Sequence, residues 1–192
     1  PNGAFFRKDK KGFLPEMMEK MYDDRVTYKK LLLETQQRYE DTGDKSLLKD
    51  ISKYNNIQMA KKISLNSAYG AIGNNWFRYF DLLVATAITT SGQLSIRWIE
   101  KALNKYLNKI LKTDGEDYVI ASDTDSVYIT FDSLVSRVFK EGTNTNKIIS
   151  FLDKVAKDKL EPFINRSYSE LAEVVGAYEN RMNMSREVIA DK

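Results

Sequence analysis

The stretch YVIASDTDSVYI, residues 118–129, decides the fold class because it brings β-strands into a chain whose pattern is otherwise mostly helical. Two runs of β-branched and aromatic residues flank the tetrapeptide DTDS, and Asp and Ser favour turns. The pattern predicts a strand, a tight turn and a second, antiparallel strand. Asp123 and Asp125 stand on either side of Thr124, and we expect their carboxylates to lie together at the tip of the hairpin.

Two neighbouring carboxylates repel each other unless a cation lies between them. Hard divalent cations such as Mg²⁺ prefer oxygen ligands and keep water molecules that a phosphate can replace. Asp123 and Asp125 are therefore candidate metal ligands. From the tetrapeptide alone, a plain turn is an equally good interpretation.

Composition narrows the chemistry that is available. The chain has 192 residues, 42% of them hydrophobic, which suits one large domain or two small units. It contains no cysteine and no histidine, which excludes disulfides, thiolate zinc sites and Ser-His-Asp triads. A net charge of +3 neither requires nor excludes a nucleic-acid partner.

No apolar segment is long enough to span a bilayer, and the polar start PNGAFFRKDKKG lacks the apolar core of a signal peptide. We therefore expect a cytoplasmic protein with no membrane partner. Because the chain begins with Pro1 rather than Met, we expect it to be a piece of something longer.

Helical patterns occupy most of the first 112 residues. Pro15 opens a first helix, which ends at the turn sequence DTGD, residues 41–44. A second helix is predicted from about Leu47 to Ile72, and a third from about Asp81 to Lys112. The short Gly-containing turn between the first two predicts an antiparallel helical hairpin.

One or two further helices are predicted over residues 147–175, with a kink or break at Pro162. A short strand pair is expected at Ala177–Met184 and Glu187–Ile189. The predicted fold class is α+β: a small antiparallel sheet with packed helices, and a protruding antiparallel helical hairpin.

The second predicted helix carries an unusual row of side chains. On a helical wheel, Lys62, Asn66, Tyr69, Gly70 and Gly73 share one side. A solvated helix face would normally use Lys and Glu, and each glycine costs about 1 kcal/mol relative to Ala. We infer that something approaches this backbone closely. A C-terminal helix cap would explain one glycine but not the row.

The opposite side of the same helix is rich in small residues, which predicts close packing against a neighbour. These residues are Ala60, Ser64, Ser67, Ala68 and Ala71.

The first helix supplies Arg25 and Lys29, one turn apart. If the two helices form a hairpin, these cations can converge with Lys62 on one face suited to a triphosphate. Taken alone, such a pair is usually part of a solvated face.

These residues carry a resemblance to family B DNA polymerases. KISLNSAYG, residues 62–70, resembles the fingers motif K-x-x-x-N-S-x-Y-G, and residues 123–126 resemble the palm motif D-T-D-S. Arg25 and Lys29 resemble the R-x-x-x-K pair of the partner fingers helix. WFRYFDLLVATAITTSGQLSIRWIE, residues 76–100, is similar to replicative polymerases of T-even-type bacteriophages.

The resemblance implies a division into a palm-proximal segment (1–14), a fingers hairpin (15–73) and a partial palm (74–192). It implies primer–template DNA and dNTP as partners, and two Mg²⁺ ions as cofactors. The implied roles are triphosphate binding by Arg25, Lys29 and Lys62 with Asn66 beside them, packing against the nascent base pair by Tyr69 and Gly70, and metal binding and catalysis by Asp123 and Asp125. Glu187 would be an additional acidic residue near the metals.

Several features depart from the family pattern. Ala121 and Ser122 stand where the family has Tyr-Gly before D-T-D-S, which puts efficient primer extension in doubt. The first palm motif, D-x-x-S-L-Y-P-S, does not occur before Arg25, and no exonuclease or thumb is recognisable. The resemblance therefore implies a fragment that is inactive alone. A second polypeptide or further chain segments would complete the active site and its Mg²⁺ ions, in the cytoplasm of an infected bacterial host if the source is a phage.

Two other classes stay open. DTDSV, residues 123–127, also fits the D-x-D-x-[TV] signature of haloacid-dehalogenase-type phosphotransferases, in which the first Asp is a nucleophile. A non-catalytic nucleic-acid-binding or assembly module is the other alternative.

Overall fold

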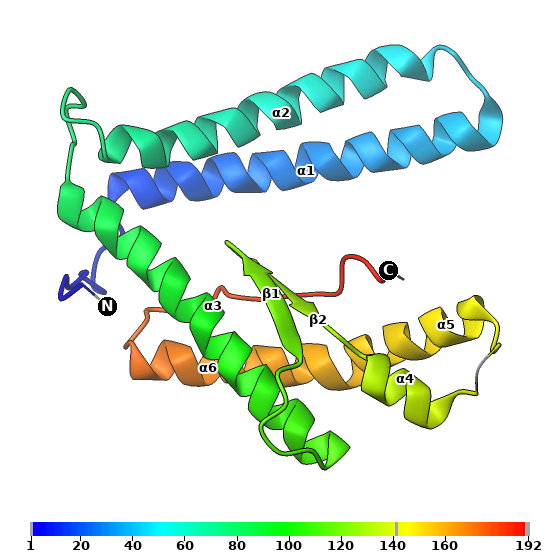
Figure 1. The fold of residues 1–192 in the computed structure, drawn as a ribbon. Helices are drawn as coiled ribbons and strands as arrows, with labels where there is room; N and C mark the ends of the chain where they lie inside the picture. The colour runs from blue at the N-terminus through cyan, green and yellow to red at the C-terminus, as the bar shows by residue number, and fades with distance from the viewer. Residues whose placement is uncertain (1, 141, 191–192) are drawn as a thin grey trace. The chain divides into compact units, whose positions relative to one another are not determined.

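The computed structural model describes residues 2–140 and 142–190. It is an α+β fold with one two-stranded antiparallel sheet, which confirms the predicted class (Figure 1). The contacts divide the chain into one unit that runs from Asn2 to Ala87 and a second that begins at Ile88. The elements are α1 (Phe13–Thr42), α2 (Leu47–Ile72), α3 (Leu82–Leu111), β1 (Val119–Asp123), β2 (Ser126–Ile129), α4 (Asp132–Val138), α5 (Thr145–Val155), the π-helical turn Ala156–Leu160 and α6 (Glu161–Val174).

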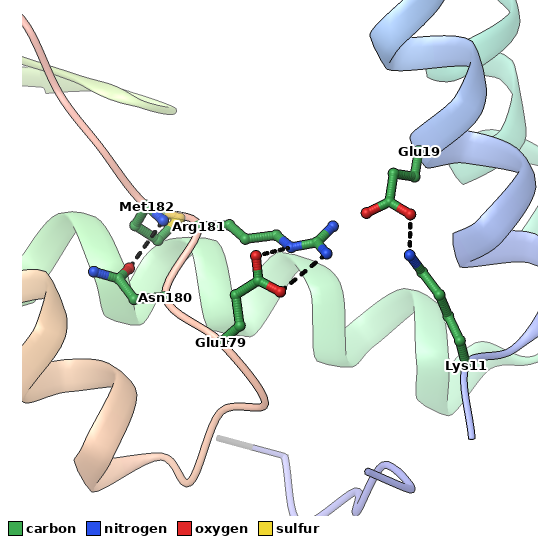
Figure 2. Close-up of polar contacts among 6 residues, drawn as sticks. All are labelled: Lys11, Glu19, Glu179, Asn180, Arg181 and Met182. Atoms are coloured by element: carbon green, nitrogen blue, oxygen red, sulfur yellow. Dashed lines mark hydrogen bonds and ion pairs between the residues drawn. The ribbon is translucent and has the colours of Figure 1, made fainter. Parts of the chain in front are cut away.

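Helices α1 and α2 run antiparallel beside each other, as predicted (Figure 1). The chain leaves α1 at Gly43, whose φ of 67° is left-handed and whose N–H donates to the Tyr39 carbonyl at 2.8 Å. Glycine adopts this conformation without a steric penalty. The short connection that follows Gly43 leads directly into α2 at Leu47. At the opposite end of α1, Lys11 pairs with Glu19 on the first turns of the helix (Figure 2).

The hairpin is held by a seam in which buried or half-buried side chains recur at alternating spacings of four and three residues, the pattern of a coiled coil. Across this seam the rings of Tyr28 and Tyr54 lie 6.2 Å apart, and Lys61 Nζ donates to Asp24 Oδ2 at 2.7 Å. The seam residues are Leu14, Met18, Met21, Arg25, Tyr28, Leu32, Thr35 and Tyr39 of α1, and Leu47, Ile51, Tyr54, Gln58, Lys61, Leu65, Ala68 and Ile72 of α2.

The small residues of α2 were predicted to form the packing side, and for most of them this is wrong. Ala60, Ser64 and Ser67 are exposed, and Ser64 Oγ bonds back to the Ala60 carbonyl at 3.0 Å. Side chains such as Leu65 pack in the seam instead, because they bury more apolar surface than Ala or Ser can.

The second unit has its core between the later part of α3, the β-hairpin and α6 (Figure 1). Trp98 Nε1 donates to both the hydroxyl and the carbonyl oxygen of Ser167 at 3.0 Å, and the rings of Tyr106 and Phe163 stack at 4.0 Å. The buried core residues are Ile99, Leu103, Leu107, Leu111, Tyr118, Val119, Ala156, Leu160, Ile164, Tyr168 and Leu171.

Two asparagines of α3 attach the entry of the β-hairpin to that helix. Asn104 Oδ1 accepts from the backbone N–H groups of Tyr118 and Val119 at 2.9 and 3.1 Å. Asn108 Oδ1 accepts from the Glu116 N–H at 3.0 Å, and its amide donates to the Glu116 carbonyl at 2.7 Å. These hydrogen bonds satisfy backbone groups at the entry of the hairpin that β2 does not pair. They therefore fix the place where β1 begins.

The break predicted near Pro162 is confirmed as a π-helical turn, Ala156–Leu160, between α5 and α6. Pro162 lies in the first turn of α6. Proline has no N–H to donate to the carbonyl four residues earlier, and a widened turn accommodates that loss.

The strand pair predicted at Ala177–Met184 and Glu187–Ile189 is wrong, because residues 177–190 contain no strand. Contacts between near neighbours replace a strand ladder: Arg181 pairs with Glu179 at 3.1 Å and Asn180 Oδ1 accepts from the Met182 N–H at 3.0 Å (Figure 2). A β-branched run becomes a strand only where a partner edge is available.

The C-terminal segment is instead tethered through one arginine. The Arg186 side chain pairs with Asp153 Oδ1 at 2.5 Å, and its backbone N–H donates to Glu161 Oε1 at 3.0 Å. Lys157 and then Arg186 hold the pKa of the Asp153 carboxyl below its ordinary value. The segment therefore follows α5 and α6 without regular secondary structure.

Candidate functional site

The acidic pair lies at the tip of a tight hairpin, as predicted. Asp123 ends β1 and faces Ser126, which begins β2, so Thr124 and Asp125 alone form the turn. Both carboxylates are exposed. An irregularity in the ladder between Val119 and Ala121 adds twist near the start of β1.

Three hydrogen bonds shape this turn. The Asp125 N–H donates to the Asp123 carbonyl at 2.5 Å, and Ser126 Oγ donates to the same carbonyl at 3.2 Å. Thr124 Oγ1 donates to Asp123 Oδ1 at 3.0 Å. Thr124 itself has a φ of 47°, which is unusual for a β-branched residue.

The hairpin rests on the core of its own unit. Val119 is buried, and Val127 and Ile129 pack against the core cluster. Tyr168, buried on α6, has a pKa raised by that burial and further by the negative charge of Asp125.

The donor set at the tip suits a hard cation. Asp123 and Asp125 offer carboxylate oxygens, the ligand type that Mg²⁺ prefers, but two carboxylates fill only part of an octahedral shell. Residues 2–140 and 142–190 contain no cluster of three or more Asp, Glu, His or Cys side chains that could hold a metal. Glu187, exposed in the C-terminal segment, is thus not grouped with the aspartate pair.

The predicted cationic and amide side chains lie on the helical hairpin. Lys29 on α1 and Lys62 and Asn66 on α2 are exposed, whereas Arg25 is half-buried in the seam. The Nε atom of Arg25 is buried and has no hydrogen-bond partner among the described residues. Arg25 and Lys29 also line a shallow hollow on α1, together with Tyr22, Val26, Lys30, Leu33 and Glu34.

The ion pair between Asp24 and Lys61 links the two helices. Arg25 follows Asp24 and Lys62 follows Lys61 in the sequence, so each of these two cations is the neighbour of one member of the pair.

Tyr69 and Gly70 lie one turn beyond Asn66 and are both exposed. A Cβ atom added at Gly70 would meet no atom within 4 Å. Gly73 occupies the C-cap position with a φ of −83°, a conformation open to any residue. Helix capping therefore does not explain the glycine at position 70.

The part of the chain that the structure describes contains no helix both long and apolar enough to cross a membrane. The acidic tip belongs to the unit that begins at Ile88, and the cationic hairpin to the unit that ends at Ala87.

Known proteins resemble this chain over the segments that carry the cationic hairpin and the acidic tip. Residues 1–161 match the model of DNA polymerase family B. The chain is 34% identical, over 232 aligned residues, to the DNA-directed DNA polymerase of Escherichia phage RB69, and 33% identical over 236 residues to that of Enterobacteria phage T4. Each alignment covers 99% of this chain and 26% of the relative.

More distant relatives match as well. The chain is 30% identical over 158 residues to the DNA polymerase beta of African swine fever virus (isolate Tick/Malawi/Lil 20-1/1983), an alignment that covers 79% of this chain and 12% of that protein. The phage alignments are longer than the 192 residues of this chain, so the phage proteins carry additional residues within the matched region. From the family match and these identities, the chain belongs to DNA polymerase family B.

Proposed function

We propose that this chain supplies the nucleotide-binding helices and two catalytic carboxylates of a DNA-directed DNA polymerase. The observation that carries the proposal is that cationic and amide side chains on two paired helices and a two-aspartate hairpin tip occur together in a family B chain. The chain spans about a quarter of the length of its phage relatives. Further polypeptide is therefore proposed to complete the active site.

Binding of the incoming dNTP is assigned to the helical hairpin. Arg25, Lys29 and Lys62 would carry three positive charges to the triphosphate, with Arg25 able to bind two oxygens at once. Asn66, one turn from Lys62, adds an uncharged donor. The Arg25 Nε atom, buried without an acceptor among the described residues, supports this assignment because a phosphate oxygen would satisfy it.

Reading of the nascent base pair is assigned to Tyr69 and Gly70. A flat ring beside a bare backbone accepts any base pair of the correct shape and makes no base-specific hydrogen bond. The open space at Gly70 supports this role, because the protein itself leaves that surface unfilled.

Nucleotidyl transfer is assigned to the hairpin tip. Asp123 and Asp125 would hold two Mg²⁺ ions, which when bound activate the primer 3′-hydroxyl and neutralise charge on the phosphates. In the reaction the primer 3′-hydroxyl gives up its proton to solvent, its oxygen bonds to the α-phosphorus of the dNTP, and the bond from that phosphorus to the leaving pyrophosphate breaks. Asp123 and Asp125 would hold the ions beside these reacting groups.

The proposed partners are primer–template DNA, dNTP and polypeptide that contributes the first palm motif. Similarity to phage proteins favours action in the cytoplasm of a bacterial host. We expect no robust primer extension by the 192-residue chain alone.

The decisive experiment mixes the chain with a polypeptide that carries the exonuclease domain and first palm motif of a family B polymerase, and measures Mg²⁺-dependent primer extension. We expect extension with wild type and with the control Asp114→Asn, an exposed aspartate outside the tip. Asp125→Asn should abolish it. Equal extension by Asp125→Asn would contradict the proposed chemistry.

The alternatives predict different results. A non-catalytic nucleic-acid-binding module would show salt-sensitive DNA binding that neither Mg²⁺ nor Asp125→Asn alters. A haloacid-dehalogenase-like enzyme would form a phospho-aspartate at Asp123. The placement of Asp123 at a two-residue turn between paired strands disfavours this class, in which the signature opens a loop.

A further inference from the structure

The turn between the two candidate metal ligands is built with an unexpected residue. Thr124 has a φ of 47°, in the left-handed region that side chains rarely adopt. Five glycines of the chain have positive φ, but the described non-glycine residues with positive φ are only Thr124 and Lys112. The chain thus uses glycine for most left-handed positions, and a threonine at the acidic tip.

Packing does not explain this threonine, because it is exposed at the end of the hairpin. A β-branched residue is the least suited to positive φ, and such strained positions concentrate at functional sites. Glycine would turn the chain more easily here. The reason for a threonine at position 124 must therefore lie in what its side chain contacts.

The Thr124 side chain makes one contact that glycine could not. Its hydroxyl donates to Asp123 Oδ1 at 3.0 Å. Because branching restricts rotation about the Cα–Cβ bond, the hydroxyl stays where it can reach that oxygen. One oxygen of Asp123 is held, and Oδ2 remains available to a cation beside Asp125.

We propose that Thr124 is a positioning residue that pre-orients the Asp123 carboxylate for divalent-cation binding. The proposal rests on the proposed function, because it concerns the same metal site. The turn at Thr124 separates Asp123 from Asp125 by one residue at the hairpin tip, and the hydrogen bond from its hydroxyl would restrict the Asp123 side chain. The backbone strain at Thr124 would be offset by a carboxylate that is already oriented for the cation before the cation binds.

The test uses the 192-residue protein with Mn²⁺ as a paramagnetic probe, followed by line broadening in the amide NMR spectrum. Thr124→Val keeps the branched shape and removes the hydroxyl, and we expect it to bind Mn²⁺ about fivefold more weakly, the effect of one hydrogen bond. Thr124→Ser keeps the hydroxyl and should bind more tightly than Thr124→Val. Thr145→Val, at the exposed start of α5, is the matched control and should bind as wild type does.

Thr124→Gly provides the sharper readout, because its two effects should have opposite signs. It should raise the denaturant midpoint by relieving strain and weaken Mn²⁺ binding by removing the hydroxyl. A threonine that only shaped the turn would not produce this combination. Retention of the wild-type amide spectrum in α3 and α6 checks that each variant is folded.

Two outcomes would overturn the proposal and are distinguishable. If wild type binds Mn²⁺ at the tip, as shown by loss of broadening in D123N/D125N, and Thr124→Val and Thr124→Gly bind equally well, the positioning role is wrong while the proposed function stands. If wild type shows no broadening that depends on Asp123 and Asp125, the metal site itself is wrong, and both proposals fall.

Discussion

Gly70 is a single residue at which the needs of the fold and the needs of a bound ligand can be told apart. It lies inside α2, where glycine lowers helix stability, and no neighbouring atom would contact a Cβ atom placed there. The fold alone would therefore favour alanine at this position. We infer that something approaches this position from outside, in line with the proposed contact with the nascent base pair.

Gly70→Ala should therefore stabilise the protein by about 0.5–1 kcal/mol, as measured by urea unfolding. The same variant should weaken dNTP-dependent binding of primer–template in the complemented enzyme, because a methyl group would occupy the base-pair surface. Gly92→Ala is the matched control: Gly92 lies in α3, and a Cβ atom added there would also meet no atom within 4 Å. It should stabilise without affecting binding. Destabilisation by Gly70→Ala would show that the fold does need this glycine.

Asp24 makes a pH-dependent contribution to the hairpin. Its hydrogen bond from Lys61 holds the pKa of the Asp24 carboxyl below its ordinary value. A lowered pKa in the folded state means that the stabilisation is present above the unfolded pKa, near 4, and is lost as pH falls through the folded value.

We expect Asp24→Asn to lower stability at pH 7 and to make the decline between about pH 5 and pH 2 shallower than in wild type. Urea unfolding at stepped pH values measures both effects. Asp23→Asn is the control, because Asp23 is the exposed neighbour and forms no ion pair among the described contacts. Parallel curves for wild type and Asp24→Asn would exclude this ion pair as a source of acid sensitivity.

At the scale of elements, the attachment of the β-hairpin to α3 depends on Asn104. Asn104→Leu would leave the backbone N–H groups of the buried residues Tyr118 and Val119 without their acceptor. We expect a loss of about 2–4 kcal/mol in unfolding free energy, since each buried unpaired amide costs about 1–3 kcal/mol. Asn165→Leu, at an exposed position of α6, should change stability little. A small effect at Asn104 would mean that water replaces the side-chain oxygen.

The elements themselves were largely predictable from sequence, because their signals are local. Pro15 lies in the first turn of α1 and Gly43 ends it, and the turn residues of DTDS specify the hairpin. The role of Asn104 was missed because an asparagine on an amphipathic helix has no periodic signal that reveals its partner. The hairpin seam differed from expectation because larger side chains such as Leu65 bury more apolar surface than the small residues of α2 do.

The candidate site was predictable only in part for the same physical reason. The motif residues could be recognised by their type and spacing, but the Asp24–Lys61 ion pair beside them joins residues that are 37 positions apart in the sequence. The strand pair predicted over residues 177–190 failed because strand formation depends on a partner edge and not on the run itself.

At the scale of the whole molecule, α3 takes part in both units, which divide between Ala87 and Ile88. Its first turn carries exposed Leu82 and Leu83, whereas Ile99 and Leu103 are fully buried in the core of the second unit. Local opening follows the density of buried contacts. The helix should therefore not open as one body.

Native-state hydrogen exchange should reveal a gradient along α3. Amides from Ile99 to Leu111 should exchange only through global unfolding of their unit, and amides near Leu82 should exchange through local fraying. Mass spectrometry of overlapping peptides, or NMR, measures the protection at each position. Uniform protection along all of α3 would show that the helix opens as a single cooperative body.

The π-helical turn Ala156–Leu160 has a consequence for how this family member can change in length. A π turn holds one residue more than an α turn, so it takes up an extra residue while α5 and α6 keep nearly the same rotational phase. Deleting Asp158 would therefore permit an unbroken α-helix and leave Asp153 close to Arg186. Deleting a second residue from the same stretch would rotate α5 by about 100° and draw it in by about 1.5 Å, which would move Asp153 away from Arg186. A single deletion here should thus be mild, whereas a double deletion should detach the C-terminal segment from α5.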